Sequence, residues 1–181
     1  MGLKEATWEH HKAAERQEFV SKMFKGNLTD QEYATFCYNQ VLQYQALEVT
    51  ADTHGLLKDM PDIIRHQLIN KDYYELWDAD TPPPVLNVTK EFVDYIYGLD
   101  GDKCRLMAHI YTRHMGDLMG GQMLKKCTPG SSQWHTFADP DTLKTRIREE
   151  IGECMGDEKI VDEVKVAYEF ATKTFEEMLT L

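Results

Sequence analysis

The stretch that most constrains the fold is residues 103–126, KCRLMAHIYTRHMGDLMGGQMLKK, whose apolar residues recur at helical spacing. Gly116, Gly120 and Gly121 interrupt it, and each glycine costs about 1 kcal/mol of helix stability relative to alanine. Because a domain keeps only about 5–15 kcal/mol of net stability, this loss indicates that another group lies flat against the bare backbone or that the helix bends. Close helix–helix packing is the simpler alternative for glycines at this spacing.

The polar residues beside the glycines favour a chemical site. Arg113 and Asp117 are four residues apart, which places a cation and an acid on one helix face, and Tyr111 and His114 add groups that exchange protons. The charged residues of the stretch also exclude a membrane span, which needs about 20 apolar residues.

The rest of the chain carries helical patterns as well. Predicted helices cover residues 3–25, 30–53, 61–77, 89–97, 103–126, 140–154 and 157–179. Thr29 and Glu32 form a capping-box pattern, Gly26 is predicted to end a helix, Pro140 to open one, and the prolines at 82–84 to form an extended connector. Since no segment shows strand alternation, the predicted fold class is all-α, in a single domain over residues 1–181.

The amino-acid composition limits the kinds of protein that this chain can be. A chain of 181 residues with 42% hydrophobic and 28% charged residues is typical of a soluble domain, and a net charge of -11 disfavours nucleic acid as a partner. The polar start and the absence of a long apolar run predict neither a signal peptide nor a membrane anchor, and we expect a cytoplasmic protein. Four widely spaced cysteines without a CxxC motif predict neither a disulfide nor a zinc site: Cys37, Cys104, Cys127 and Cys154.

The sequence YTRHMGDLMGGQMLKK at 111–126 resembles the distal-helix signature of the haem oxygenases, which in many members reads YTRYLGDLSGGQ, an apolar residue and LKK. It departs from that signature at His114, where an aromatic residue is usual, and at Met119, where serine is usual. The resemblance extends more weakly from Leu3 to about Met178. It implies a helical haem oxygenase-like fold, with haem between the first helix and the glycine-containing distal helix.

His10 and His11 are the candidate metal ligands, because they lie near the inward face of the first predicted helix. By spacing alone, each is more often a structural or surface histidine. When LKEATWEHHKAAE is aligned on the family pattern KEAT-x-E-x-H-x-x-A-E, the resemblance assigns the iron to His11. It assigns to Glu15 the acid that orients the ligand's second ring nitrogen, although a solvated helix acid explains Glu15 equally well.

Haem carries two propionates, which require cations. The resemblance places these cations at Lys4, two turns before His11, and at Lys144 and Arg148 on a later helix; otherwise each would be an ordinary surface base. Further cofactor contacts implied by the resemblance are Tyr111, Thr112 and Tyr168.

The resemblance also implies the reaction: O2 and electrons open the porphyrin ring to give biliverdin, expected as the α isomer, with iron and carbon monoxide. The three glycines would let dioxygen lie close to the ring. Asp117 would order the water that supplies a proton, and Arg113 and Tyr44 would orient that network. A tyrosine at the spacing of Tyr44 is otherwise a core residue.

Two other functions remain open. A haem carrier or sensor would use the same histidine and cations, and only Asp117 with its glycines argues against it, because storage needs no proton relay. A helical interaction module would bind no haem.

The charge distribution suggests an electron donor. Segments 1–26, 102–126 and 141–148 hold thirteen Lys and Arg residues against seven Asp and Glu residues, in a chain whose net charge is -11. This excess predicts a docking collar for a soluble acidic donor, ferredoxin, as in the similar plant and cyanobacterial enzymes, with a bilin reductase as a downstream partner. The collar consists of Lys12, Lys22, Lys25, Lys125, Lys126 and Arg146.

Overall fold

The computed structural model describes residues 2–60 and 62–181, which fold into ten α-helices and one 3-10 turn without a β-strand. The predicted all-α class is therefore confirmed. The elements are α1 (Leu3–Ala6), α2 (Trp8–Glu15), α3 (Glu18–Phe24), α4 (Asp30–Thr53), α5 (His66–Leu76), α6 (Asn87–Gly98), α7 (Lys103–Met119), α8 (Gly121–Leu124), α9 (Pro140–Glu153), η1 (Cys154–Gly156) and α10 (Ile160–Met178). Within the described part of the chain, no helix combines the length and the apolar character needed to cross a bilayer.

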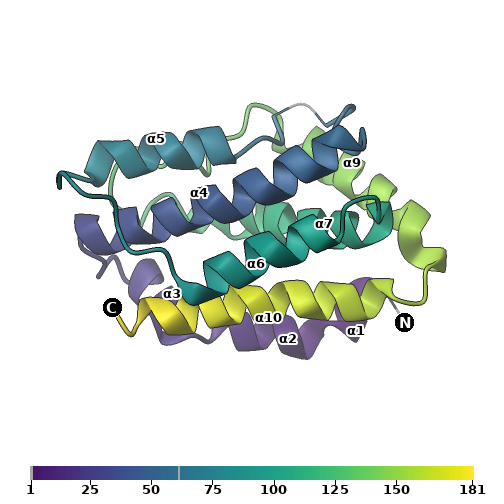
Figure 1. Cartoon of the computed structure of the whole chain (residues 1–181), viewed down its shortest axis with the longest axis horizontal. Helices are drawn as coiled ribbons and strands as arrows, with labels where there is room; N and C mark the ends of the chain where they lie inside the picture. Colours follow the sequence, from purple (N-terminus) through teal and green to yellow (C-terminus); the bar gives the residue numbers. More distant parts are fainter. Residues whose placement is uncertain (1, 61) are drawn as a thin grey trace.

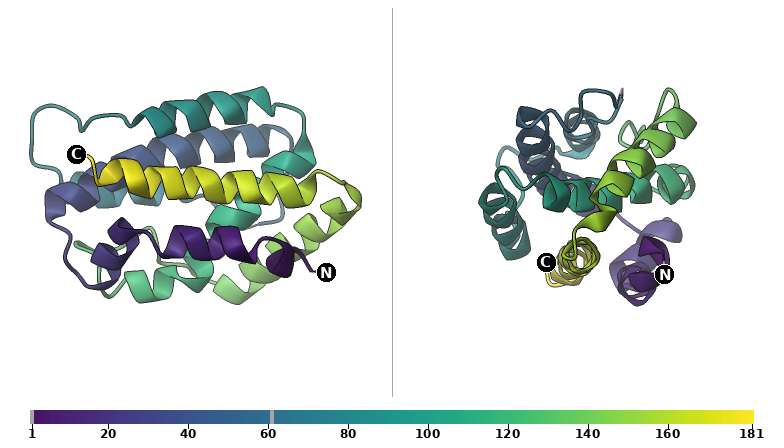
Figure 2. Two further views of the ribbon diagram at one scale, coloured as in Figure 1. Left: turned by 90° about the horizontal axis from the view of Figure 1, so that it is seen from below. Right: turned by 90° about the vertical axis from the view of Figure 1, so that its right-hand side faces the viewer.

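The long helix α4 lies at the centre of the arrangement (Figure 1). It packs against α5, α6 and α7, and α7 in turn packs against α9 and α10. The N-terminal helices α2 and α3 lie along α10, as the view from below shows, and the two chain ends lie at opposite ends of the molecule (Figure 2). The distal helix and the first helices are thus joined mainly through α10.

The single helix predicted for residues 3–25 is divided into three. The Thr7 hydroxyl donates to the carbonyl of Leu3 at 2.9 Å, and the helix breaks at Thr7. Gln17 adopts an extended backbone, which redirects α3 so that Phe19 and Met23 are buried. Helix propensity alone did not indicate the breaks at Thr7 and Gln17.

Most other predicted boundaries hold. Thr29 and Glu32 form the expected capping box at the start of α4, and Gly26 has the left-handed φ of +66° that ends the preceding segment. The predicted start at Pro61 lies outside the described residues, and α5 begins at His66. The glycine-containing helix breaks at Gly120, which separates α7 from α8.

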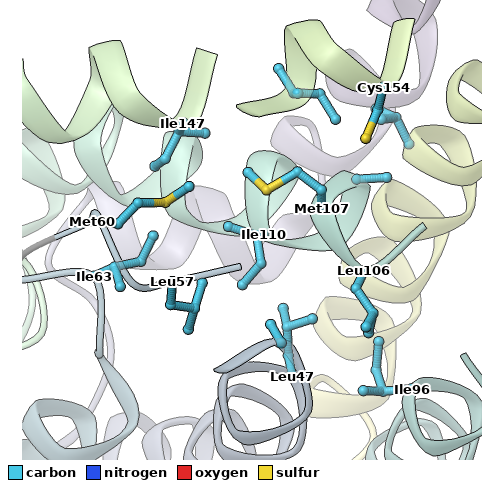
Figure 3. Close-up of a cluster of buried hydrophobic side chains, with 14 of the residues drawn as sticks. Leu47, Leu57, Met60, Ile63, Ile96, Leu106, Met107, Ile110, Ile147 and Cys154 are labelled. Atoms are coloured by element: carbon cyan, nitrogen blue, oxygen red, sulfur yellow. The ribbon is translucent and has the colours of Figure 1, made fainter. Parts of the chain in front are cut away.

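The larger hydrophobic core lies where α4, α7 and α9 meet (Figure 3). Leu47, Ile110 and Ile147 are each fully buried and point into it. Full burial of one such side chain stabilises the fold by about 1.5–3 kcal/mol. A second cluster, rich in aromatic residues, includes Phe36 and Trp134 together with residues of α3 and α5.

Two cysteines correct the sequence analysis. Cys104, at the start of α7, and Cys154, in η1, form a disulfide with their Cα atoms 5.4 Å apart. The prediction of unpaired cysteines was wrong because the helices bring together two residues that are 50 positions apart in the sequence. Cys37 and Cys127 are free thiols.

Candidate functional site

The three glycines of the distal helix have three different surroundings. Apart from its chain neighbours and the backbone of its own helix, no described residue has an atom within 4 Å of the position that a Cβ of Gly116 would take, whereas a Cβ at Gly120 would lie 3.2 Å from the carbonyl oxygen of Gly116. At Gly121 a Cβ would lie 2.5 Å from a ring nitrogen of His135. Only Gly116 therefore presents bare backbone to open space, where a flat ligand can approach.

Asp117, the next residue, is buried, and its Oδ2 accepts a hydrogen bond of 2.8 Å from the Tyr44 hydroxyl of α4. The structure thus brings together the predicted acid and the predicted tyrosine. Burial raises the pKa of Asp117 to about 6, against the electrostatic influence of His114 and the hydrogen bond from Tyr44. This carboxyl group can accept and release a proton near neutral pH.

Arg113 is also buried but does not pair with Asp117. Its guanidinium donates to the side-chain oxygens of Gln40 (3.1 Å) and Gln43 (2.5 Å) on α4, and lies over the ring of Phe92 at 4.1 Å. Burial lowers the pKa of Arg113. The cation therefore contributes a fixed positive charge beside α4, the helix that carries Tyr44.

Sequence reasoning missed Glu48, one turn after Tyr44. This fully buried carboxylate accepts the backbone N–H of Arg65 at 2.8 Å and lies 2.5 Å from His66 Nδ1 and 2.9 Å from His114 Nε2. Burial opposes ionisation, but the hydrogen bonds from His114 and His66 prevail and lower the pKa of Glu48 to about 2. His114, one of the two departures from the family signature, is thus held by an anion on α4.

The segment 131–139 was also missed, because it lies between the helices predicted at 103–126 and 140–154. Trp134 and His135 are buried in it, and the Trp134 ring lies edge-on to Tyr44 with centroids 5.6 Å apart. Their adjacency in a polar segment was the available signal.

His11 of α2 lies among aromatic rings. It stacks on Trp8, with centroids 5.3 Å apart, and meets the edge of Tyr168 of α10 at 5.5 Å. Its Nδ1 is buried without a hydrogen-bond partner among the described residues, 3.5 Å from Glu15 Oε2. His10 instead lies 3.7 Å from Glu169. An imidazole whose Nδ1 faces an acid suits a metal ligand that binds through Nε2.

Other predicted contacts gather around Tyr168. Burial raises its pKa, and Tyr111 and Glu15 are close enough to raise it further. Burial also raises the pKa of Tyr111, against the opposing charge of Arg148 of α9. Four predicted cofactor contacts from α2, α7, α9 and α10 therefore influence one another electrostatically.

The three remaining predicted cofactor contacts, Lys4, Lys144 and Thr112, interact with neighbouring residues of the protein. Lys4 Nζ lies 5.8 Å from the centre of the Trp8 ring, and Lys144 pairs with Asp141 at 3.2 Å. Thr112 is buried, and its hydroxyl donates to the carbonyl of Ala108 at 2.8 Å. Their contacts with a cofactor stay predictions.

The sequence of this chain is similar to those of known haem oxygenases. The sequence profile described as Heme oxygenase matches residues 1–177. Heme oxygenase 1 of Synechocystis sp. is 28% identical, with 97% of this chain and 82% of that protein aligned. Heme oxygenase 2 of Macaca fascicularis is also 28% identical over 97% of this chain, which spans 64% of that relative's length.

Solved structures agree with the sequence comparison. Heme oxygenase-1 of Synechocystis sp. in complex with heme matches with a TM-score of 0.84 and 27% identity, over 97% of this chain and 89% of that one. Heme oxygenase from Leptospira interrogans matches with a TM-score of 0.83 and 25% identity, over 97% of each chain. The resemblance and the predicted all-α, haem oxygenase-like fold are confirmed, and the chain belongs to the haem oxygenase family.

Proposed function

We propose that this protein opens the ring of haem with O2 and electrons, giving biliverdin as its α isomer, iron and carbon monoxide. The observation that carries the proposal is Asp117, a buried carboxyl group with a pKa of about 6 that lies beside the bare backbone of Gly116 and is oriented by Tyr44. A haem carrier or sensor needs no such proton donor. Ring opening consumes protons beside the bound oxygen, so Asp117 favours catalysis.

The first helix would hold the substrate. His11 would bind the iron and Glu15 would orient its ring, while Lys4, Lys144 and Arg148 would neutralise the propionates. Bound haem would supply the iron that activates dioxygen and the ring that is cleaved. The unpaired Nδ1 of His11, 3.5 Å from Glu15, supports this assignment.

The distal helix would supply the protons. Gly116 leaves room for the flat ring, and Asp117 would hold a proton on its carboxyl group. Tyr44 donates to Asp117 Oδ2 and so fixes the orientation of that group. Arg113 would add a positive charge that favours negative charge developing on oxygen.

The test is to add hemin to the purified protein, follow the Soret band, and then supply a reductant in air. We expect stoichiometric binding and a bile-pigment spectrum. His11→Ala should lose the imidazole-ligated spectrum, with partial rescue by free imidazole, whereas His10→Ala is the matched control and should keep it. Asp117→Asn should bind hemin normally but yield little pigment.

These outcomes separate the candidate functions. Hemin binding without pigment in the wild-type protein would support the carrier, and no binding would support the interaction module. Normal pigment yield from Asp117→Asn would remove the role given to that residue.

We also infer a soluble acidic electron donor, ferredoxin, that docks on the basic collar. Lys12, Lys22 and Arg146 already pair with neighbouring acids at 2.7–3.0 Å. Lys25 and the Lys125–Lys126 pair form no ion pair with described residues, and so they remain available to a partner. Charge reversal at these three lysines should weaken ferredoxin-supported turnover, and so should added salt, because the Debye length is only about 8 Å at 0.15 M. Turnover unaffected by both changes would exclude the collar.

A further inference from the structure

His135 lies in the irregular segment 131–139, and the proposed reaction gives it no role. Its side chain is only 2% exposed, and its ring stacks on Trp134 with centroids 4.7 Å apart and planes at 19°. Its Nδ1 is buried without a hydrogen-bond partner among the described residues. An unpaired buried polar atom destabilises the fold, so an apolar residue would fill this space better if packing were its only role.

The His135 ring lies directly against the backbone of Gly121. A Cβ at position 121 would lie 2.5 Å from His135 Nδ1, 3.0 Å from its Cγ and 3.4 Å from its Cβ. The first distance is shorter than any ordinary contact between these atoms. Any side chain at position 121 therefore requires either the ring or the start of α8 to move.

The ring has little freedom to move, because the backbone around it is held on several sides. The Asp72 carboxylate of α5 accepts the backbone N–H groups of Gln133 (2.7 Å) and Trp134 (2.8 Å). The Gln122 side chain donates to the carbonyl of His135 at 3.0 Å. These bonds join the segment both to α5 and to α8. A side chain added at position 121 would therefore displace the distal helix rather than the His135 ring.

Gly121 is the first residue of α8 and follows Asp117 by one helical turn. The preceding Gly120 has helical dihedral angles and donates its N–H to the carbonyl of Gly116 at 2.7 Å. The backbone of Gly116, the orientation of Asp117 and the break are therefore coupled through one turn of helix. A contact that fixes Gly121 also fixes this turn.

We propose that His135 is a positioning residue, which holds the break between α7 and α8 through its contact with Gly121 and thereby sets the placement of Asp117 and of the bare backbone at Gly116. The inference rests on the proposed function for the meaning of that placement. It assigns Gly121 to the contact with His135, and leaves Gly116 as the glycine that faces the ligand.

A double-mutant cycle tests the contact, with variants Gly121→Ala, His135→Ala and the two combined. The readouts are the denaturation midpoint of the haem-free protein, the pKa of Asp117 followed by carbon NMR of its carboxyl group, and hemin affinity. Gly121→Ala should lower the midpoint, change the pKa of Asp117 and weaken hemin binding by about tenfold, which corresponds to about 1.4 kcal/mol. In the His135→Ala background the added methyl group has room, so the same change should cost less than about threefold.

Gly116→Ala is the matched control, since its Cβ would meet no atom within 4 Å and its effects should be equal in both backgrounds. Equal losses from Gly121→Ala in both backgrounds, including failure of both proteins to fold, would overturn the proposal. His135→Ser provides a second background in which the ring is absent. The haem-free readouts keep this test separate from the proposed function, which fails if wild-type protein does not bind or cleave haem.

Discussion

At the scale of single residues, Asp117 is a carboxyl group whose surroundings favour its protonated form. Its pKa in the folded protein is about 6, compared with about 3.9 for an aspartate in an unfolded chain. Between these values the folded state binds more protons than the unfolded state. The free energy of unfolding should therefore fall as pH rises from about 4 to about 6, by up to about 3 kcal/mol from this residue.

Asp117→Asn should remove this fall, because the amide oxygen still accepts from Tyr44 but does not titrate. The measurement is denaturant unfolding of haem-free protein between pH 4 and pH 8. We expect the variant to gain stability relative to wild type as pH rises. His135, with a pKa lowered to about 3 by burial and by the charges of Arg65 and Lys125, acts in the opposite sense in both proteins and cancels in the difference. If the free energies of unfolding of wild type and Asp117→Asn differed by the same amount at every pH in this range, the raised pKa of Asp117 would be contradicted.

The residues of the site show what the sequence could and could not reveal. Tyr44 and Asp117 were found by their motifs and do meet. The partner of His114 was not found, because Glu48 is 66 residues away and only the packing of α4 on α7 joins them. Arg113 was placed on the same face as Asp117 by spacing, yet it bonds to two glutamines of α4 instead, since its long side chain reaches past its own helix.

At the scale of helices, glycine at position 116 makes the distal helix less stable but leaves its backbone open to a ligand. The Cβ of an alanine there would meet no atom within 4 Å. Gly116→Ala should raise the free energy of unfolding of the haem-free protein by about 0.5–1 kcal/mol, because alanine favours the helix and restricts the unfolded chain. The same methyl group should weaken hemin binding by about tenfold or more, since it projects into the ligand's space.

Gly152 of α9 offers a matched control for this prediction, because a Cβ there would also meet no atom within 4 Å. Gly152→Ala should give a similar gain in stability without a change in hemin affinity. Thermal unfolding and hemin titration of both variants make the comparison. Undiminished hemin affinity in Gly116→Ala would place the ligand elsewhere.

Helix boundaries were predictable where local chemistry sets them and not where packing does. Thr29, Glu32 and Gly26 act through their own hydrogen bonds and dihedral angles, and the predicted ends hold. The breaks at Thr7 and Gln17 reorient short helices onto α10, a helix about 150 residues later in the chain. No pattern within residues 3–25 contains that information.

At the scale of the whole molecule, the disulfide between Cys104 and Cys154 joins the start of the distal helix to η1, which directly follows α9, the helix of Lys144 and Arg148. It closes a loop across a sequence separation of 50 residues. In the chain-entropy view, such a closure stabilises the fold by about 4 kcal/mol. Reductant, or Cys154→Ser, should therefore lower the denaturation midpoint.

The control for this prediction is Cys127→Ser, which removes a free thiol and should leave the sensitivity to reductant unchanged. Thiol counting by mass spectrometry under oxidising conditions should find two free cysteines. Four free thiols, or a denaturation midpoint that does not change with reductant, would show that the disulfide does not stabilise the fold. In the cytosol predicted from the sequence, the reduced form is the one to study for activity.

The packing of the first helices on the last one has a consequence for synthesis. Tyr168 and Glu169 of α10 contact His11 and His10, and α3 also packs against this helix. A ribosome adds about 5–20 residues per second, so residues 8–15 emerge many seconds before residues 160–178. Until then the histidine-bearing helix α2 lacks α10, the helix against which it mainly packs. We therefore predict that truncation within α10 abolishes hemin binding, followed by the Soret band, even though His11, the predicted iron ligand, is present.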